Sequence, residues 1–232
     1  MNQQLNRAQV EQLVRSSLKR QIGAVGAPEA SSVAASAKLA VGPSSLVVNS
    51  SARHCHLSQE AVEVLFGPGY QLTPMKWLYM EGQYAAKESV TLIGPRSRVI
   101  SNLRILGPCR DFNQVELAYT DAISLGFKVP VRNSGDIAGT PGGMLMGPAG
   151  YLEMDKGIIR AAPHAHMTPK DAEYYGVKDK TYMKLRVGGD LSMTFDRIFV
   201  RIDPAFKLEV HIDTDEANAC GLGPSVPCEL IK

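Results

Sequence analysis

From Leu46 onward, apolar and polar residues alternate with the period of two that is typical of β-strands. The clearest runs are Met183, Leu185 and Val187, then Leu191, Met193 and Phe195, then Ile198, Val200 and Ile202. Glycine or proline separates such runs about every ten residues, as in all-β barrels. The pattern therefore predicts a mainly β body built from short strands.

Three short helices are expected within this body. One follows Ser58, one follows Thr168, and one covers the acidic stretch just after His211. Thr168 has the features of an N-cap, with Pro169 at the first helical position and Asp171 completing a capping box. Acidic residues at the start of the third helix complement the helix dipole.

Residues 1–22 follow the pattern of an amphipathic helix instead. The apolar positions of its expected face are Val10, Leu13, Val14, Leu18 and Ile22. Residues 23–45 contain 17 Gly, Ala, Ser or Pro among 23, which is the composition of a flexible linker. We expect the helix either to fold back on the body or to dock on a partner helix or groove. Membrane-surface binding is less favoured because the apolar face lacks aromatic anchors.

Composition narrows the class of protein. The 232 residues include 25 basic and 23 acidic side chains, a net charge of +2 that gives no case for binding nucleic acid. No apolar run reaches the ~20 residues that span a bilayer, and the start lacks a secretory signal pattern. The four cysteines show no CxxC spacing. We therefore expect a cytosolic protein without a membrane or nucleic-acid partner.

Four of the five histidines belong to two copies of one pattern. The copies are RHCHLSQEAVEVLFG, from Arg53, and PHAHMTPKDAEYYG, from Pro163. A second pair of segments, LRILGPCRDFNQVELAYTDA and VRIDPAFKLEVHIDTDEANA, aligns two Arg-Ile dipeptides and places Glu116 opposite His211. The sequence therefore indicates an internal repeat that brings all five histidines and one carboxylate to equivalent places.

The His-x-His pattern suits a metal ion. On a strand, residues two apart point to the same face ~6–7 Å from each other, so two imidazoles can converge on one ion. Three N/O ligands with an open position are the usual catalytic zinc arrangement. The two predicted ligand sets are His54, His56 and Glu116, and His164, His166 and His211. The sequence alone leaves open which histidines share an ion.

Basic residues gather just before Glu116: Arg96, Arg98, Arg104 and Arg110. Such arginines are most often solvated strand-edge charges. Arg110 differs because it directly precedes a predicted ligand strand, and a guanidinium beside a metal suits an oxyanion such as phosphate. Cys55 should point from its strand into the core, and Cys109 has no base beside it, so a cysteine nucleophile has little support.

Four stretches resemble the phosphate propanoyltransferase (phosphotransacylase) family of bacterial microcompartments, of the propanediol-utilisation type. They are VVNSSARHCHLSQE, RVISNLRILGPCRDFNQVELAYTDA, VPVRNSGDIAGTPG and VHIDTDEANA, within a resemblance that runs from about Leu46 to Gly223. The resemblance implies an acyltransferase with two zinc ions per chain. It would interconvert propanoyl-CoA or acetyl-CoA plus phosphate with acyl phosphate plus coenzyme A.

The resemblance also implies roles for particular residues. It assigns the two ligand sets to two zinc ions and Arg110 to phosphate. Coenzyme A contacts would fall on Val48, Asn49 and Ser50, with Arg98, Arg104 and Asn218 as neighbours. Together with the repeat, it implies two β-barrel domains, one of residues 46–53 plus 161–232 and one of residues 54–160. Residues 1–22 would target the chain to the microcompartment lumen by binding shell or lumen proteins.

Two other functions stay open at this point. His54, His56, Glu60 and Gly67 fit the spacing of a cupin-type mononuclear metal oxygenase, although that interpretation leaves His164 and His166 unexplained. The other alternative is a non-catalytic microcompartment adaptor that uses metal for structure. The sequence does not give the acyl-chain preference or show whether the chain forms a homo-oligomer. The last residues, PSVPCELIK, match no motif.

Overall fold

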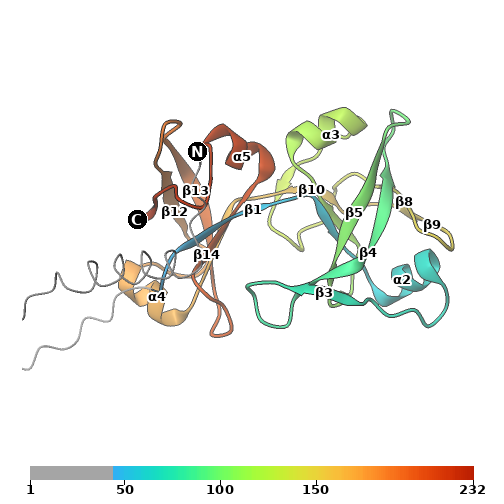
Figure 1. The fold of residues 1–232 in the computed structure, drawn as a ribbon, viewed down its shortest axis with the longest axis horizontal. Helices are drawn as coiled ribbons and strands as arrows, with labels where there is room; N and C mark the ends of the chain where they lie inside the picture. The colour runs from blue at the N-terminus through green and yellow to red at the C-terminus, as the bar shows by residue number, and fades with distance from the viewer. Residues whose placement is uncertain (1–43) are drawn as a thin grey trace, which may run out of the picture. The chain divides into compact units, whose positions relative to one another are not determined.

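The computed structural model describes residues 44–232. The predicted helix of residues 1–22 lies outside the described residues, as do residues 23–43 of the predicted linker. The described chain forms two β-sheets with short helices beside them (Figure 1). The predicted mainly β fold with two barrel-like domains is therefore confirmed, and each expected barrel is a curled, half-barrel sheet.

One sheet has six strands, which come from both ends of the described chain. In spatial order they are β1 (Val47–Ser51), β14 (Glu209–Asp213), β11 (His164–Met167), β13 (Met193–Ile202), β12 (Tyr182–Val187) and β15 (Cys228–Ile231). β1 pairs in parallel with β14, which brings Val47 opposite Glu209. β15 pairs with β12, so the C-terminal segment that matched no motif supplies an edge strand of this sheet.

The other sheet has nine strands, and all of them lie in one continuous stretch of the chain. The main path is β7 (Val131–Arg132), β10 (Ile158–Ala161), β6 (Gln114–Glu116), β2 (His54–His56), β5 (Val99–Gly107), β4 (Tyr84–Ile93), β8 (Gly143–Met146) and β9 (Tyr151–Met154). β3 (Pro74–Trp77) pairs with the N-terminal part of β4. These ranges are the bounds of the strands. The predicted domains, residues 46–53 plus 161–232 and residues 54–160, remain a prediction.

The three predicted helices are present. They are α2 (Gln59–Phe66), α4 (Pro169–Tyr175) and α5 (Thr214–Ala219). Thr168 caps α4, and its capping box with Asp171 forms as expected. A further helix, α3 (Tyr119–Leu125), was not predicted separately. It begins after Ala118, which has no side chain that can cap it, so the usual sequence signal for a helix start is missing.

Each sheet packs around its own apolar core. On β12, Met183, Leu185 and Val187 are buried and alternate with exposed residues, as the pattern predicted. Leu191 and Met193 are exposed instead, because the chain turns between β12 and β13 there. Apolar alternation therefore located the strands but overstated the length of one buried run.

The repeat is visible in how the strands pair. β2 and β11 each lie between an antiparallel and a parallel neighbour, and the antiparallel neighbours are β6 and β14. Ile105 lies opposite Cys55, and Val200 lies opposite Ala165. Ile105 and Val200 are therefore equivalent, so the sequence alignment of the two Arg-Ile dipeptides is wrong by two residues at this point.

Two short connections join the sheets. The chain passes from β1 to β2 and returns from β10 to β11 (Figure 1). Each connection leads directly into a His-x-His strand. Arg160, on β10, also binds Asp213 and Glu216 of the other sheet's α5 segment, at 2.6 and 2.5 Å. The two connections and these ion pairs bring the His-x-His strands, β2 and β11, close to the boundary between the two sheets.

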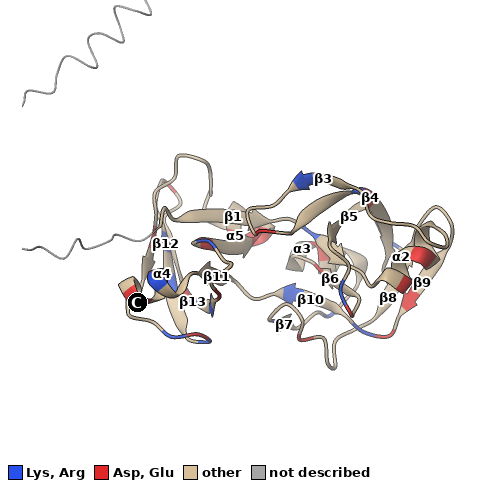
Figure 2. Cartoon of the chain, turned by 90° about the horizontal axis from the view of Figure 1, so that it is seen from below, with Lys and Arg blue, Asp and Glu red and all other residues tan. Residues whose placement is uncertain are grey.

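Basic and acidic residues are interspersed along the strands of both sheets and the helices beside them (Figure 2). Among the described residues, no helix is long and apolar enough to cross a membrane.

Candidate metal centre

His54, His56 and Glu116 come together on neighbouring antiparallel strands. β2 carries both histidines, and β6 places Glu116 directly opposite His54. Glu116 Oε2 lies 3.5 Å from His54 Nε2, and Glu116 Oε1 lies 4.0 Å from His56 Nε2. All three side chains are buried, and their candidate ligand atoms lie within 4.8 Å of one another. We call these residues the His54 group.

His164, His166 and His211 form an equivalent group on the other sheet. β11 carries the first two, and β14 places His211 directly opposite His164. The three imidazole rings lie 4.8 to 5.1 Å apart between centroids, and their candidate ligand atoms again fall within 4.8 Å of one another. We call these residues the His164 group. The structure thus brings together both sets of residues that the repeat grouped.

The first histidine of each group is oriented by the backbone. His54 Nδ1 lies 2.8 Å from the carbonyl oxygen of Ala52, and His164 Nδ1 lies 2.9 Å from that of Ala162. A carbonyl only accepts hydrogen bonds, so Nδ1 must donate and Nε2 keeps its lone pair. Such a contact fixes the tautomer that a metal-binding histidine needs.

Burial and neighbouring charges together keep several of these side chains in the form that binds metal. Burial, with the neighbouring His54 and Arg110 charges, lowers the pKa of His56 to about 3. Burial and the nearby His211 lower the pKa of His164 to about 4. Burial opposes ionisation of Glu116, but His54 and His56 outweigh it and lower its pKa. At neutral pH these three groups are two neutral imidazoles and a carboxylate, as ligation requires.

The His164 group contains buried polar atoms that no protein group satisfies. His166 Nδ1 and His211 Nε2 are buried and make no hydrogen bond with the described residues, although a carboxylate oxygen of Glu209 lies 3.1 Å from His211 Nε2. An unpaired buried polar atom costs free energy, so such atoms indicate a missing partner. Imidazole nitrogens and a carboxylate oxygen are donors that zinc prefers. The residues of each group therefore form a set that could hold a metal ion such as zinc.

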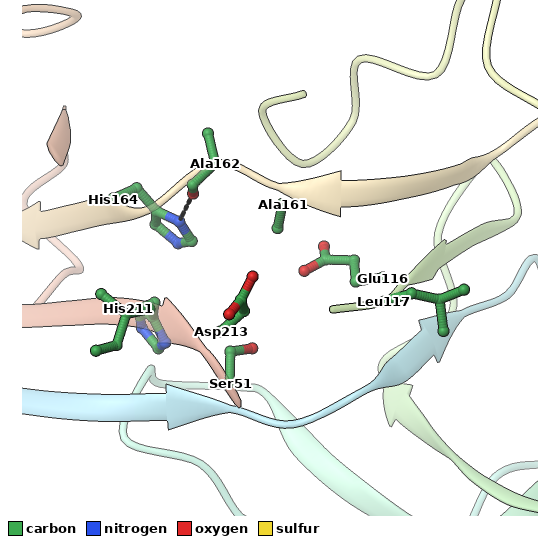
Figure 3. Close-up of a pocket in the computed structure, with 9 residues that line it drawn as sticks. Ser51, Glu116, Leu117, Ala161, Ala162, His164, His211 and Asp213 are labelled. Atoms are coloured by element: carbon green, nitrogen blue, oxygen red, sulfur yellow. Dashed lines mark hydrogen bonds between the residues drawn. The ribbon is translucent and has the colours of Figure 1, made fainter. Parts of the chain in front are cut away.

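Both groups face one pocket. It is lined by Glu116 from the His54 group, by His164 and His211, and by Ser51 and Asp213 beside them. Figure 3 shows the Glu116 carboxylate pointing into the pocket from one side while His164 and His211 border it on the other. A small substrate placed here would lie close to both groups.

Two arginines lie beside the groups without a carboxylate partner. Arg110 Nη1 donates to Ser134 Oγ at 3.3 Å, and Arg201 Nη1 lies 3.5 Å from His166 Nε2. Burial lowers the pKa of Arg110, and the Arg201 charge contributes to this shift. Among residues 44–232, neither arginine forms an ion pair with an acidic side chain. Two partly buried guanidinium groups without a counter-charge favour an anionic ligand.

Sequence reasoning found Arg110 but missed Arg201. The repeat alignment matched Arg201 with Arg104, whereas the strand register makes Leu106 its equivalent. It also missed Gln114 and Glu209, which lie opposite the second histidine of each group. Their position two residues before Glu116 and His211 was a signal that could have found them, because strand residues two apart share a face.

The residues proposed to contact coenzyme A fall in different places. Val48, Asn49 and Ser50 lie on β1, where Asn49 is opposite His211. Arg104 is opposite His54, but its Nη1 donates to the carbonyl oxygens of Ala86 and Lys87. The remaining two candidates, Arg98 and Asn218, are exposed, in the turn before β5 and on α5. The structure thus places β1 and Arg104 beside the strands that carry the histidines. Arg98 lies six residues before Arg104 along the chain.

The side chains considered for other chemistry lie away from the site. Glu60, the carboxylate of the cupin spacing, is exposed in the first turn of α2, and Glu116 takes its place beside His54 and His56. Cys55 is fully buried, as predicted, and burial raises the pKa of its thiol. Burial also raises the pKa of Cys109, which donates to Gln59. Neither thiol is activated as a nucleophile.

Comparison with known sequences gives a consistent result. Residues 47–223 match the family described as phosphate propanoyltransferase. A phosphate propanoyltransferase of Planctopirus limnophila is 52% identical over 229 residues, covering 98% of this chain and 92% of that protein. One from Thermotoga maritima is 54% identical over 178 residues, covering 76% and 84%. One from Sebaldella termitidis is 41% identical over 217 residues, covering 94% of both chains.

Proposed function

The chain belongs to the phosphate propanoyltransferase family, and we propose that it transfers a short acyl group between coenzyme A and phosphate at the pocket between its two histidine groups. It is thus an acyltransferase. The observation that carries the proposal is a pocket bordered by Glu116 of one group and by His164 and His211 of the other. Arg201 lies beside His166, and Arg110 is held by Ser134 near Glu116. The acyl group is propanoyl or acetyl.

Each group would hold one zinc ion through three protein ligands. His54, His56 and Glu116 supply two nitrogens and an oxygen, and His164, His166 and His211 supply three nitrogens. Three protein ligands leave a coordination position for substrate. When bound, zinc supplies Lewis-acid chemistry, which polarises a thioester carbonyl or stabilises a thiolate.

The arginines would bind the phosphate. Arg110 donates a hydrogen bond to Ser134. It also lies near enough to Glu116 for the carboxylate charge to act on its guanidinium group. A phosphate oxygen attacks the thioester carbonyl carbon, a C–O bond forms, and the C–S bond breaks with its electron pair leaving on sulfur. The products are acyl phosphate and coenzyme A. Arg110 and Arg201 neutralise the charge of the phosphate and orient it for attack.

A coupled assay tests this reaction directly. Full-length protein purified without chelator is incubated with propanoyl-CoA or acetyl-CoA and phosphate, and free thiol and acyl phosphate are measured. We expect both products in equal amounts. A protein that consumes no acyl-CoA in the presence of phosphate, while its metals are bound, would support the non-catalytic adaptor instead. Oxygen uptake without thiol release would support the cupin-type oxygenase.

We further propose that residues 1–22 direct the enzyme to the lumen of a bacterial microcompartment by binding a shell or lumen protein. The amphipathic pattern and the linker composition support this proposal. The family match begins only at residue 47, which suggests that the preceding segment is separate from the chemistry. The match to the Planctopirus limnophila relative spans 229 of the 232 residues and so extends through most of that segment.

Deleting residues 1–42 tests the role of the segment. Turnover by the truncated protein should stay within about twofold of the full chain, since the described ligands lie beyond residue 42. Co-localisation with compartments in cells should be lost. A truncated protein that is inactive, or one that still enters compartments, would contradict the targeting role.

A further inference from the structure

The two groups have one difference that the strand register makes easy to see. The residue opposite the second histidine is Gln114 in the His54 group and Glu209 in the His164 group. Both are almost completely buried. Each precedes the third residue of its group by two positions on the same strand. β6 therefore reads Gln-x-Glu where β14 reads Glu-x-His.

Each of these buried side chains contacts the third residue of its own group. Gln114 Nε2 donates to Glu116 Oε1 at 2.7 Å. Glu209 Oε2 lies 3.1 Å from His211 Nε2, outside the direction in which that nitrogen would donate a hydrogen bond. The first contact is a hydrogen bond to a carboxylate, and the second acts mainly through charge.

The two pairs carry the same net charge in the opposite order. In the His54 group the carboxylate is the ligand and its neighbour is a neutral amide. In the His164 group the ligand is an imidazole, which binds metal in its neutral form, and its neighbour is the carboxylate. Each pair therefore brings one negative charge to its group.

Both neighbours are held in place by other, partly buried hydrogen bonds. Gln114 donates to Ser134 Oγ at 2.9 Å and accepts from the backbone N–H of Gly135 at 2.7 Å. Asn49 Nδ2 donates to Glu209 Oε1. A buried carboxylate is costly unless it is paired, and no lysine or arginine of residues 44–232 forms an ion pair with Glu209. Its charge therefore favours a cation bound at the His164 group.

We propose that Glu209 supplies to the His164 group the negative charge that the ligand Glu116 supplies to the His54 group, so that the carboxylate has exchanged places with a neutral residue between the two copies. Glu209 and Gln114 are then positioning residues. They make the metal affinities of two chemically different ligand sets similar. The inference rests on the metal-binding part of the proposed function. It adds that the neighbours Glu209 and Gln114 give the three-histidine set and the two-histidine, one-carboxylate set the same net charge.

The test measures zinc affinity by competition with a chromophoric chelator, together with the visible spectrum of the Co²⁺-substituted protein. Glu209→Gln keeps the shape of the side chain and removes its charge. We expect the affinity for one of the two ions to fall about 10- to 100-fold, with a changed cobalt spectrum at that site only. Glu229→Gln is the matched control, because Glu229 is exposed on β15 of the same sheet. It should change neither measurement.

A second pair of variants tests the exchange in the other sheet and does not depend on Glu209→Gln folding. Glu116→His alone leaves the His54 group without a carboxylate and should weaken one zinc ion. Adding Gln114→Glu recreates the Glu-x-His order of β14 and should restore affinity to within about tenfold of the wild type. A double variant that binds no better than Glu116→His would overturn the inference.

The outcomes separate this inference from the metal proposal. Wild-type protein that binds zinc at neither group would overturn both. Wild-type protein that binds two ions, combined with Glu209→Gln that binds them with unchanged affinity, would overturn the charge exchange and leave the metal sites standing. Metal-free melting temperatures of all variants confirm that differences in affinity do not come from unfolding.

Discussion

The two histidine groups share their strand pairing but differ in access. All three residues of the His54 group are buried, whereas His164 and His211 are only partly buried and line the pocket. Of the His54 group, only Glu116 borders that pocket. The repeat therefore gives two ligand sets with the same strand pairing but with different access from the pocket. We expect the His54 group to act mainly as a fixed charge and the His164 group to face the reacting atoms.

The largest expected effect comes from removing one ligand from each group. His54→Ala and His164→Ala each leave two protein ligands, and each should lower kcat/KM by more than about 100-fold because the ion is weakly held. Zinc content should fall by about one ion per chain in either variant. The measurements are metal analysis, steady-state kinetics and melting temperature on the same preparations.

Stability should separate the two ligand variants. His54→Ala leaves Glu116 buried without its nearest imidazole, so its melting temperature should fall further than that of His164→Ala. Equal losses of stability would remove the distinction between a closed and an open group. Full activity with one ion per chain would contradict the two-ion site altogether.

The arginines give the second comparison. Arg110→Lys should lower kcat/KM for phosphate about 30- to 1000-fold, or about 2–4 kcal/mol, because lysine cannot make a bidentate contact. Arg201→Lys should cost less, roughly tenfold, because no hydroxyl of the described residues holds Arg201 as Ser134 holds Arg110. Phosphate kinetics, zinc content and coenzyme A binding are measured for both variants.

A purely structural role for either arginine makes a different prediction. It would lower melting temperature and zinc content together, with no selective change in the KM or kcat for phosphate. Unchanged phosphate kinetics in Arg110→Lys would remove that residue from the site. A phosphate defect that is larger in Arg201→Lys than in Arg110→Lys would make Arg201 the main phosphate ligand.

Effects on stability rather than on catalysis are expected at two arginines that form ion pairs outside the histidine groups. Arg160 binds Asp213 and Glu216, and all three side chains are mostly buried, so Arg160→Leu should lower the free energy of unfolding by about 2–3 kcal/mol. Arg53 makes a single pair with Asp121 and its side chain is half exposed. Arg53→Leu should therefore cost about 0.5 kcal/mol or less. Urea denaturation of both variants checks the difference, and equal losses would contradict it.

The sequence predicted the parts of this structure that depend on local pattern. His-x-His followed by a capped helix requires only neighbouring residues, so the strands, α2, α4 and both pairs of histidines could be located. The third member of each group followed from the repeat, because the last ten residues before Glu116 and His211 have equal spacing in the two copies.

What the sequence could not predict depends on contacts between distant segments. Arg201 reaches His166 from a strand 35 residues away, and nothing in its own neighbourhood distinguishes it from a solvated arginine. Arg160 was also not singled out, since its partners follow 53 and 56 residues later. The helix α3 was missed for a related reason, because tertiary packing stabilises it without a local capping signal.

The pairing of β1 with β14 has a consequence for the order in which the protein folds during synthesis. Every strand of the nine-stranded sheet lies between residues 54 and 161, so that sheet can be completed while the ribosome is still making the rest of the chain. The six-stranded sheet needs β1 from one end and β15 from the other, and Val47 meets Glu209 only across a long closure. β1 therefore remains an unpaired, exposed strand until β14 has emerged from the ribosome.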